Sequence, residues 1–228
     1  SKNNDNLIKN NEINWKVFRN LILFLKQNEI NYYNLEYASY HKKSKFLKKE
    51  IKNEKDFDDK LNFIPKSNRD KEFFIDVGSD NWQYKYYKIL FDIDYDNELI
   101  KNICINYLES LEWSFKYYTN GCPDWRWKYN YNYAPLLEDL VKYIPFFQNT
   151  FICDNDNKPI NENTQLAFVL PRVSLYLLSD KIHNDLIRNF PDYYNNSYNF
   201  CWAFCKYFWE SHAELPDINL DEIEKICT

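Results

Sequence analysis

Glycine is nearly absent from this sequence, which holds only Gly78 and Gly121 among its 228 residues. The phosphate-binding loops of Walker and Rossmann nucleotide sites depend on several glycines, because their backbone must approach the phosphate closely. This scarcity excludes both kinds of nucleotide-binding fold. Long apolar runs are absent too: no stretch of about 18 uncharged apolar residues occurs, so we expect a soluble protein with no membrane contact.

Methionine is also absent and the sequence opens on Ser1, which suits a piece of a longer protein; removal of an initiator Met before Ser1 is the open alternative. The six cysteines include no Cys-x-x-Cys pair, and no hydrophobic signal segment precedes them. We therefore expect reduced thiols in the cytoplasm, with the nucleus as the open alternative. Cys201 and Cys205 lie four residues apart, so on a helix they share a face. They lack the further ligands that zinc needs, and we expect them to be buried as apolar groups.

Positive charge is in short supply as well. The net charge is -5 and the isoelectric point is near 5.4, whereas a broad nucleic-acid groove needs clustered lysines and arginines. If the protein binds RNA, we expect a local contact or one that another region assists. The richest basic stretch, from His41 to Lys55, is interrupted and followed by acidic residues, which favours a solvated helix face over a phosphate-binding one.

Aromatic residues are what the sequence has in excess, at 19% with 20 Tyr, 17 Phe and 7 Trp. So many large apolar rings predict a globular chain with an aromatic core, although the mean hydropathy is only -0.70. At 228 residues, such a core supports one large domain or two small ones without a disulfide or a metal.

Apolar residues recur at three-and-four spacing in several stretches. The fold class that we predict is mainly α: a multi-helix domain with an irregular extended aromatic segment and few or no strands. The strongest helix spans about 97–119, with Asp96 as its cap and Gly121 just after its end. Residues 50–80 indicate a linker or a long surface loop.

Further helices are weaker. The first is expected after a cap at Asn14, with one apolar stripe that includes Leu21, Ile22 and Leu25. A separate helix is expected to carry Ile30, Tyr33 and Tyr37, and others to span 136–144, 164–187, 199–212 and 219–227.

The most informative segment runs from Gly121 to Pro135 and reads GCPDWRWKYNYNYAP. Five aromatic residues lie two apart within it, so in an extended chain their rings project to one side while Arg126 and Lys128 face the other. Such a ladder of π-faces beside cations is able to stack the bases of a single strand, at roughly 1–3 kcal/mol per base. An aromatic strand packed in a core is the alternative, and the pattern alone favours it. The five are Trp125, Trp127, Tyr129, Tyr131 and Tyr133.

The run G-C-P-x-W-x-W-x-Y-x-Y-x-Y-A-P directly follows a helix pattern with the paired Tyr117 and Tyr118, and it resembles a signature of the Xrn-type 5′→3′ exoribonuclease family. The resemblance covers about residues 80–228, an Xrn-type helical domain, whereas residues 1–79, an N-terminal helical segment and linker, match only loosely. At Asn130-Tyr131-Asn132 the sequence departs from the family's usual Pro-Tyr-His step. Further matching blocks follow in the family's order: Asp139-Leu140, Lys158-Pro159, Gln165-Leu166, Val169-Leu170-Pro171, Phe190-Pro191, Trp209-Glu210 and Leu215-Pro216-Asp217-Ile218-Asn219.

By this resemblance, the chain is the helical second half of a nuclease whose N-terminal region supplies an acidic cluster that binds two Mg²⁺ ions. That nuclease region has no counterpart here. We therefore assign no catalytic or metal-binding residue to this chain and expect it to be inactive alone. The expected cofactor is Mg²⁺, held in the nuclease region of the same protein.

The resemblance further implies that the helical half wraps the nuclease region and narrows its entrance. Single-stranded RNA with a 5′-monophosphate then enters and is degraded, as in mRNA decay. One ring stacks on the 5′-terminal bases, and by resemblance it belongs to Trp125 or Trp127, the choice staying open. Arg126 and Tyr131 complete the expected substrate-binding set. The rival hypothesis is a non-catalytic aromatic-rich module, derived from such a nuclease and kept for RNA or protein contacts.

Overall fold

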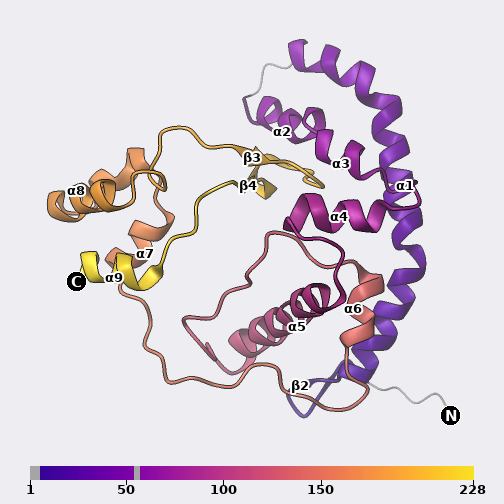
Figure 1. The fold of residues 1–228 in the computed structure, drawn as a ribbon, viewed down its shortest axis with the longest axis horizontal. Helices are drawn as coiled ribbons and strands as arrows, with labels where there is room; N and C mark the ends of the chain where they lie inside the picture. Colours follow the sequence, from indigo (N-terminus) through magenta and orange to yellow (C-terminus); the bar gives the residue numbers. More distant parts are fainter. Residues whose placement is uncertain (1–5, 54–56) are drawn as a thin grey trace. The chain divides into compact units, whose positions relative to one another are not determined.

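The computed structural model describes residues 6–53 and 57–228, without the side chains of residues 37, 40–53 and 57–59. The basic stretch from His41 to Lys55 lies outside the described side chains. The structure is 56% helical, and its described strands form two short two-stranded sheets (Figure 1). The prediction of a mainly α fold is therefore confirmed. None of the described helices has both the length and the apolar character needed to cross a bilayer.

The chain divides into two compact units. The sequence was divided between residues 79 and 80 because the family resemblance begins there, and this division stays a prediction. Residues 79 and 80 both lie inside the first unit. The first unit comprises Ser1–Asp156 and Trp202–Glu210, and the second comprises Asn157–Cys201 and Ser211–Thr228.

A short hairpin opens the described part of the first unit. Its strands β1 (Ile8–Lys9) and β2 (Glu12–Ile13) pair antiparallel. Asn10 and Asn11 form the turn with φ values of 53° and 59°, a left-handed conformation that asparagine tolerates better than most residues.

Helix α1 (Trp15–Asn53) is one continuous helix of 39 residues, where the sequence predicted two. No proline or glycine interrupts it, so nothing in the backbone forces a break. Asn14 caps it as expected, accepting a first-turn amide at 3.4 Å. The single apolar stripe predicted for it is wrong in part, because Ile22 is buried while Leu21 and Leu25 are 40% and 43% exposed.

The linker predicted at residues 50–80 is wrong, because that stretch contains α2 (Phe57–Ser67) and α3 (Asp70–Ile75). Pro65 suggested a loop, but it lies inside α2, near the end of the helix, where its side chain is buried. The helix therefore forms in spite of this proline. Ile75 in α3 is fully buried. Tertiary packing here outweighs the local turn signals.

Three more helices complete the first unit. Asp96 caps the longest of them as predicted, accepting the amides of Glu98 and Leu99 at 2.9 and 3.0 Å. Together with α1 these helices enclose a core that contains Trp15 and Tyr87 among its fully buried side chains. The three are α4 (Trp82–Phe91), α5 (Asn97–Thr119) and α6 (Leu137–Tyr143).

The second unit packs short helices around a smaller core. The sequence predicted one helical stretch at 164–187, but Pro171 and the Ser179 cap divide it into three pieces. The helix predicted at 219–227 is confirmed, and Asn219 caps it by accepting an amide at 2.9 Å. The elements are α7 (Glu162–Val169), the 3-10 helix η1 (Arg172–Leu177), α8 (Asp180–Asn189) and α9 (Leu220–Cys227).

The helix predicted at residues 199–212 is wrong. Phe204 has a φ of 59°, which a right-handed helix does not accommodate. Cys201 and Cys205 are both buried, as predicted, but they do not share a helix face. The six cysteines, all described, are thiols and not disulfides, and the compartment inferred from them stays a prediction. The stretch holds β3 (Phe200–Cys201), its antiparallel partner β4 (His212–Ala213) and the 3-10 helix η2 (Phe208–Glu210).

Candidate nucleic-acid interface

The aromatic segment, residues 121–135, follows α5 without regular secondary structure of its own among the described residues. Gly121 has a φ of 101°, in the left-handed region that favours glycine, and this lets the chain leave the helix. From Arg126 to Tyr133 exposure alternates: the aromatic residues are half-buried and the residues between them are exposed. The predicted period of two is therefore present over this stretch.

Hydrogen bonds fix the start of the aromatic segment. The indole Nε1 of Trp113, on α5, donates to the carbonyl oxygen of Asp124 at 2.9 Å. The amide of Asn155 donates to the carbonyl oxygen of Pro123 at 2.7 Å. The carbonyl groups of two consecutive residues, Pro123 and Asp124, are thus held by a side chain of α5 and by the backbone of Asn155.

Trp127 and Trp125 differ in their surroundings. The ring of Trp127 lies 5.9 Å from that of Trp113, centroid to centroid, with 22° between the planes. Trp113 in turn stacks on Tyr117 at 5.2 Å and 11°, so three rings form one stack along the end of α5. Trp125 is 40% exposed. The segment therefore presents one packed tryptophan and one accessible tryptophan.

Tyr129 and Tyr131 pack inward. Tyr129 contacts the edge of Tyr107 on α5 at 5.7 Å, and Tyr131 contacts Phe91 on α4 at 5.6 Å. Burial raises the pKa of Tyr129, whose hydroxyl donates to the carbonyl oxygen of Tyr133 at 2.7 Å. These contacts assign the middle of the segment to the core of the first unit, which is the alternative that the pattern favoured.

Two consecutive tyrosines of α4 hold the backbone on both sides of Pro135. The hydroxyl of Tyr86 donates to the carbonyl oxygen of Ala134 at 2.9 Å, and the hydroxyl of Tyr87 accepts the amide of Leu136 at 3.2 Å. Burial raises the pKa of both tyrosines, so both hydroxyls keep their protons at neutral pH. Hydrogen bonds thereby hold the end of the segment as well as its start.

Carboxylates complete the attachment of this end. Glu29 of α1 accepts the amide of Leu137, the first residue of α6, at 3.0 Å. Asp139, which is 1% exposed, accepts the Tyr87 hydroxyl at 2.9 Å and the Lys142 ammonium at 2.6 Å. Local spacing does not predict the contacts of Glu29 with Leu137 or of Asp139 with Tyr87, because these partners lie far away along the chain.

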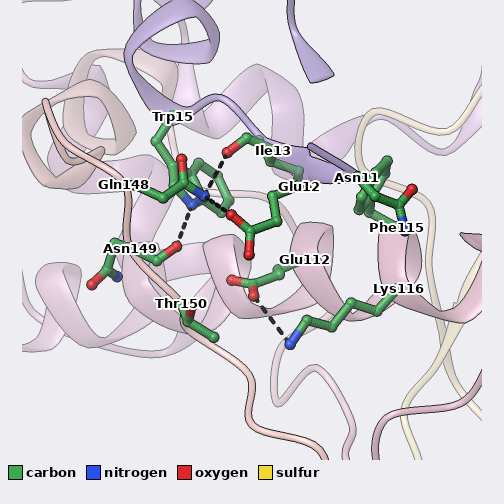
Figure 2. Close-up of a pocket in the computed structure, with 10 residues that line it drawn as sticks. All are labelled: Asn11, Glu12, Ile13, Trp15, Glu112, Phe115, Lys116, Gln148, Asn149 and Thr150. Atoms are coloured by element: carbon green, nitrogen blue, oxygen red, sulfur yellow. Dashed lines mark hydrogen bonds and ion pairs between the residues drawn. The ribbon is translucent and has the colours of Figure 1, made fainter. Parts of the chain in front are cut away.

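Polar side chains that bond to other protein groups also line a small pocket beside α5 (Figure 2). Glu112 and Lys116 form an ion pair of 3.4 Å within it, and the indole Nε1 of Trp15 donates to the carbonyl oxygen of Asn149 at 2.8 Å. Its walls come from the hairpin, α1, α5 and residues 148–150. The Trp15 bond joins segments that are distant in sequence, and we assign the pocket to the folding of the first unit.

The carboxylates whose side chains the structure describes do not fit a magnesium site. Mg²⁺ needs several converging oxygen ligands, and no group of three or more His, Cys, Asp or Glu side chains in the described part is placed to hold a metal ion. The buried carboxylates engage protein cations instead: Glu72 pairs with Arg69, Glu112 with Lys116 and Asp139 with Lys142.

Of the four predicted substrate-binding residues, Trp125 and Arg126 are exposed, whereas Trp127 and Tyr131 are half-buried. Their roles toward RNA stay predictions. Sequence reasoning missed Trp113, which both stacks on the segment and bonds to its backbone. Its position one helical turn before Tyr117 was a usable signal, because residues four apart on a helix share a face.

Comparison with known proteins agrees with the family resemblance of the sequence. A family model described as the Xrn1 helical domain matches residues 2–225. The 5'-3' exoribonuclease 2 of Gallus gallus is 30% identical over 142 residues, which cover 60% of this chain and 15% of that protein. The 5'-3' exoribonuclease 2 homolog of Drosophila melanogaster is 26% identical over 173 residues, 74% of this chain and 19% of that protein. The 5'-3' exoribonuclease 1 of Saccharomyces cerevisiae is 34% identical over 106 residues, 43% of this chain and 6% of that protein.

Proposed function

Because this chain belongs to the Xrn1 helical domain family, we propose that it is the part of a 5′→3′ exoribonuclease that lines the entrance for single-stranded RNA. The matched region spans only 15% of the Gallus gallus relative, a 5'-3' exoribonuclease. We therefore assign bond cleavage to a nuclease region elsewhere in the same polypeptide. This chain binds and orients the RNA.

The proposal rests on the exposed ring of Trp125 in a segment whose backbone is held in place. Trp125 is 40% exposed, while the segment around it is held by the Trp127 stack and by the hydrogen bond to Asp124. A ring on a fixed backbone loses little conformational freedom when a base stacks on it. We assign Trp125 to the 5′-terminal bases and Trp127 to positioning the segment.

Charge supports a local RNA contact. Arg126 is exposed directly beside Trp125, which adds a cation next to the stacking ring. The net charge of -5 requires that another region bind most of the phosphates. Since a base offers its π-face only when it is unpaired or at an end, a stacking contact suits single-stranded RNA.

The remaining chemistry belongs to the nuclease region. In this proposal, that region holds Mg²⁺ and recognises the 5′-monophosphate of the RNA, and the buried carboxylates Glu72, Glu112 and Asp139 of this chain engage protein cations. Bound Mg²⁺ there would activate water and stabilise the leaving oxygen. We place this reaction in the cytoplasm, where the six thiols would stay reduced.

The test compares Trp125→Ala with Trp127→Ala in the longer polypeptide that carries the nuclease region. Trp125→Ala should weaken the binding of 5′-monophosphorylated single-stranded RNA by roughly 1–3 kcal/mol, or about 5- to 150-fold, without lowering Tm. Trp127→Ala should lower the free energy of unfolding by about 3 kcal/mol, because it leaves a cavity in the ring stack. RNA affinity, RNA decay and thermal melting are measured for both.

Two controls sharpen this test. Trp125→Phe keeps a stacking ring and should retain most of the affinity, and Tyr176→Ala removes a ring that is 72% exposed in the second unit and should bind RNA normally. Unchanged RNA affinity in Trp125→Ala would show that the stacking assignment is wrong. A longer polypeptide that binds RNA but never degrades it would favour the non-catalytic module.

A further inference from the structure

The turn that contains η2 exposes a stacked pair of aromatic rings. The indole of Trp209 lies 4.4 Å from the ring of Tyr207, centroid to centroid, with 6° between the planes. Trp209 is nevertheless 70% exposed, and because Tyr207 covers one face of the indole, the opposite face meets solvent. We name this pair the Trp209 platform. It offers one flat, open π-face on which a further planar ring is able to stack in parallel.

Hydrogen bonds hold the backbone of this turn in place. The Glu210 carboxylate accepts the amides of Lys206 and Tyr207 at 2.6 and 3.0 Å, which closes the turn on itself. The amide of Phe208 donates to the side chain of Asn62 on α2 at 3.2 Å, which attaches the turn to the rest of the first unit. The Trp209 platform therefore stands on a fixed backbone, and little conformational freedom is lost when a ligand stacks on it.

Two cations accompany the Trp209 platform. The ammonium of Lys206 lies 5.1 Å from the centroid of the Tyr207 ring. Lys66 lies one helical turn after Asn62, which bonds to the turn, so both are on the same face of α2. The Glu210 carboxylate is also exposed, but one of its oxygens is turned toward the amides of the turn itself. Positive charge thus lies beside the open ring, as a contact to a phosphate requires.

This chemistry suits a nucleotide better than a protein surface. The anchor residues of protein interfaces lie in apolar surroundings that exclude water, whereas Trp209 shares its turn with Lys206 and Glu210, which are exposed and charged. A nucleotide of a single strand brings a planar base for the indole and a phosphate for the lysine, so it uses both features. Trp125 and Arg126 show the same pairing of an exposed ring with an adjacent cation in the same unit.

We propose that the Trp209 platform is a second stacking site for single-stranded RNA, separate from the site at Trp125. Since the 5′-terminal bases are assigned to Trp125, the platform takes an unpaired base that lies 3′ to them, and Lys206 binds a neighbouring phosphate. This inference rests on the proposed function, because it concerns the same strand. It adds that the RNA contact extends beyond the aromatic segment to the turn at residues 205–210.

The experiment measures how the longer polypeptide binds a 5′-monophosphorylated trinucleotide and an RNA of about 16 nucleotides, with Mg²⁺ chelated so that both stay intact. Trp209→Ala should weaken binding of the long RNA about 5- to 150-fold, as expected for the loss of one stacked base, and leave trinucleotide binding unchanged. Trp209→Phe keeps a ring and should retain most of the affinity. Phe147→Ala is the matched control, because it removes a ring that is 69% exposed on another segment of the first unit.

Salt dependence tests the phosphate contact separately. Lys206→Ala should lower the slope of log affinity against log salt by about 0.7, the value for one phosphate contact to a single strand, and Lys206→Arg should restore the slope. A merely structural role for Lys206 would change the affinity or Tm and leave this slope as it is in the wild type.

Photocrosslinking locates the base directly. Long RNA that carries thiouridine should crosslink to the peptide that contains Trp209, as identified by mass spectrometry. Unchanged affinity for the long RNA in Trp209→Ala overturns the inference, and so does an equal loss with both RNAs, since the site would then not be separate from the terminal one. A lowered Tm with normal RNA affinity identifies a protein contact and also overturns it.

The two tryptophans also separate this inference from the proposed function. Weak RNA binding in Trp125→Ala together with normal binding in Trp209→Ala overturns the second site and leaves the proposed function standing. The reverse pattern removes the assignment of Trp125 to the terminal bases and supports the Trp209 platform.

Discussion

Different kinds of contact stabilise the interior of each of the two units. In the first unit, three buried carboxylates join distant segments: Glu72 accepts the amide of Phe204 at 2.6 Å, Glu112 accepts the amide of Phe151 at 2.7 Å, and Asp139 accepts the Tyr87 hydroxyl. Each such bond spans many residues of sequence. Buried charged groups of this kind stabilise a fold only while their partners are in place.

The second unit relies on aliphatic packing and local caps. Leu175, Leu186 and Ile223 are fully buried in its core, and among its described residues the buried polar side chain is that of Thr164. Its helices are capped from within their own first turns, as when Asn161 accepts the amide of Thr164 at 2.8 Å. The second unit also has a buried long-range bond, from the Tyr194 hydroxyl to the carbonyl oxygen of Ala167 at 2.6 Å. The contrast is therefore that buried carboxylates make the long-range contacts of the first unit and that none of the described buried side chains of the second unit is a carboxylate.

Breaking the Glu72 contacts should produce the largest effect. Glu72→Ala leaves the Arg69 guanidinium buried without its carboxylate and removes the acceptor of the Phe204 amide, and should cost about 3–5 kcal/mol of unfolding free energy. Urea unfolding followed by tryptophan fluorescence suits this test, because all seven tryptophans lie in the first unit. Glu98→Ala is the matched control: it breaks the exposed pair with Lys101 and should cost about 1 kcal/mol or less.

Similar losses in Glu72→Ala and its control would remove the basis of the comparison, since the buried pair would then behave like a surface pair. Equal losses would mean that water or another side chain replaces the missing carboxylate.

The second unit should respond most to loss of an aliphatic side chain. Leu186→Ala removes a fully buried group and should cost about 3 kcal/mol through lost burial and the cavity left behind. Hydrogen exchange of α8 and α9 should rise, while tryptophan emission keeps its native maximum. Leu177→Ala, at a position 60% exposed, should change exchange little. A blue- or red-shifted emission in Leu186→Ala would show that the two units do not unfold separately.

The same contrast explains which elements the sequence predicts. Helix α5 is predictable because its apolar spacing, the Asp96 cap and Gly121 agree. The helix expected at 199–212 fails because apolar spacing alone cannot reveal the positive φ of Phe204. The linker expected at 50–80 fails in the opposite direction, since burial of residues such as Ile75 outweighs turn-forming residues.

The candidate site is predictable in part for the same reason. The alternation from Trp127 to Tyr133 is a local property of an extended chain, and it is visible in the sequence. Which tryptophan is accessible depends on Trp113, and the fixed ends of the segment depend on Tyr86 and Asp139. These are contacts between segments, which composition and spacing do not specify.

The smallest expected effect concerns the carboxylate of Glu29. Burial is the main cause that raises its pKa above the ordinary value of 4.5; the amides of Leu137 and Glu138 lower it in part, and the charges of Glu138 and Asp139 raise it. Since the folded state holds this proton more tightly than the unfolded chain, the stability from Glu29 is fully present below pH 4.5 and is lost as pH rises through the raised pKa.

Glu29→Gln tests that sign, because it removes the charge and keeps an oxygen that accepts the Leu137 amide at the start of α6. The wild type should lose stability relative to this variant between pH 4.5 and the raised pKa, so at pH 7 the variant should match or exceed the wild type by less than ~1 kcal/mol. Glu29→Ala also removes the acceptor and should be about 1 kcal/mol less stable than Glu29→Gln at every pH. Tm is measured from pH 4 to 8 for all three proteins. If Glu29→Gln is as unstable as Glu29→Ala at pH 7, the contact needs the negative charge, and the first unit depends on ionised carboxylates even where burial opposes ionisation.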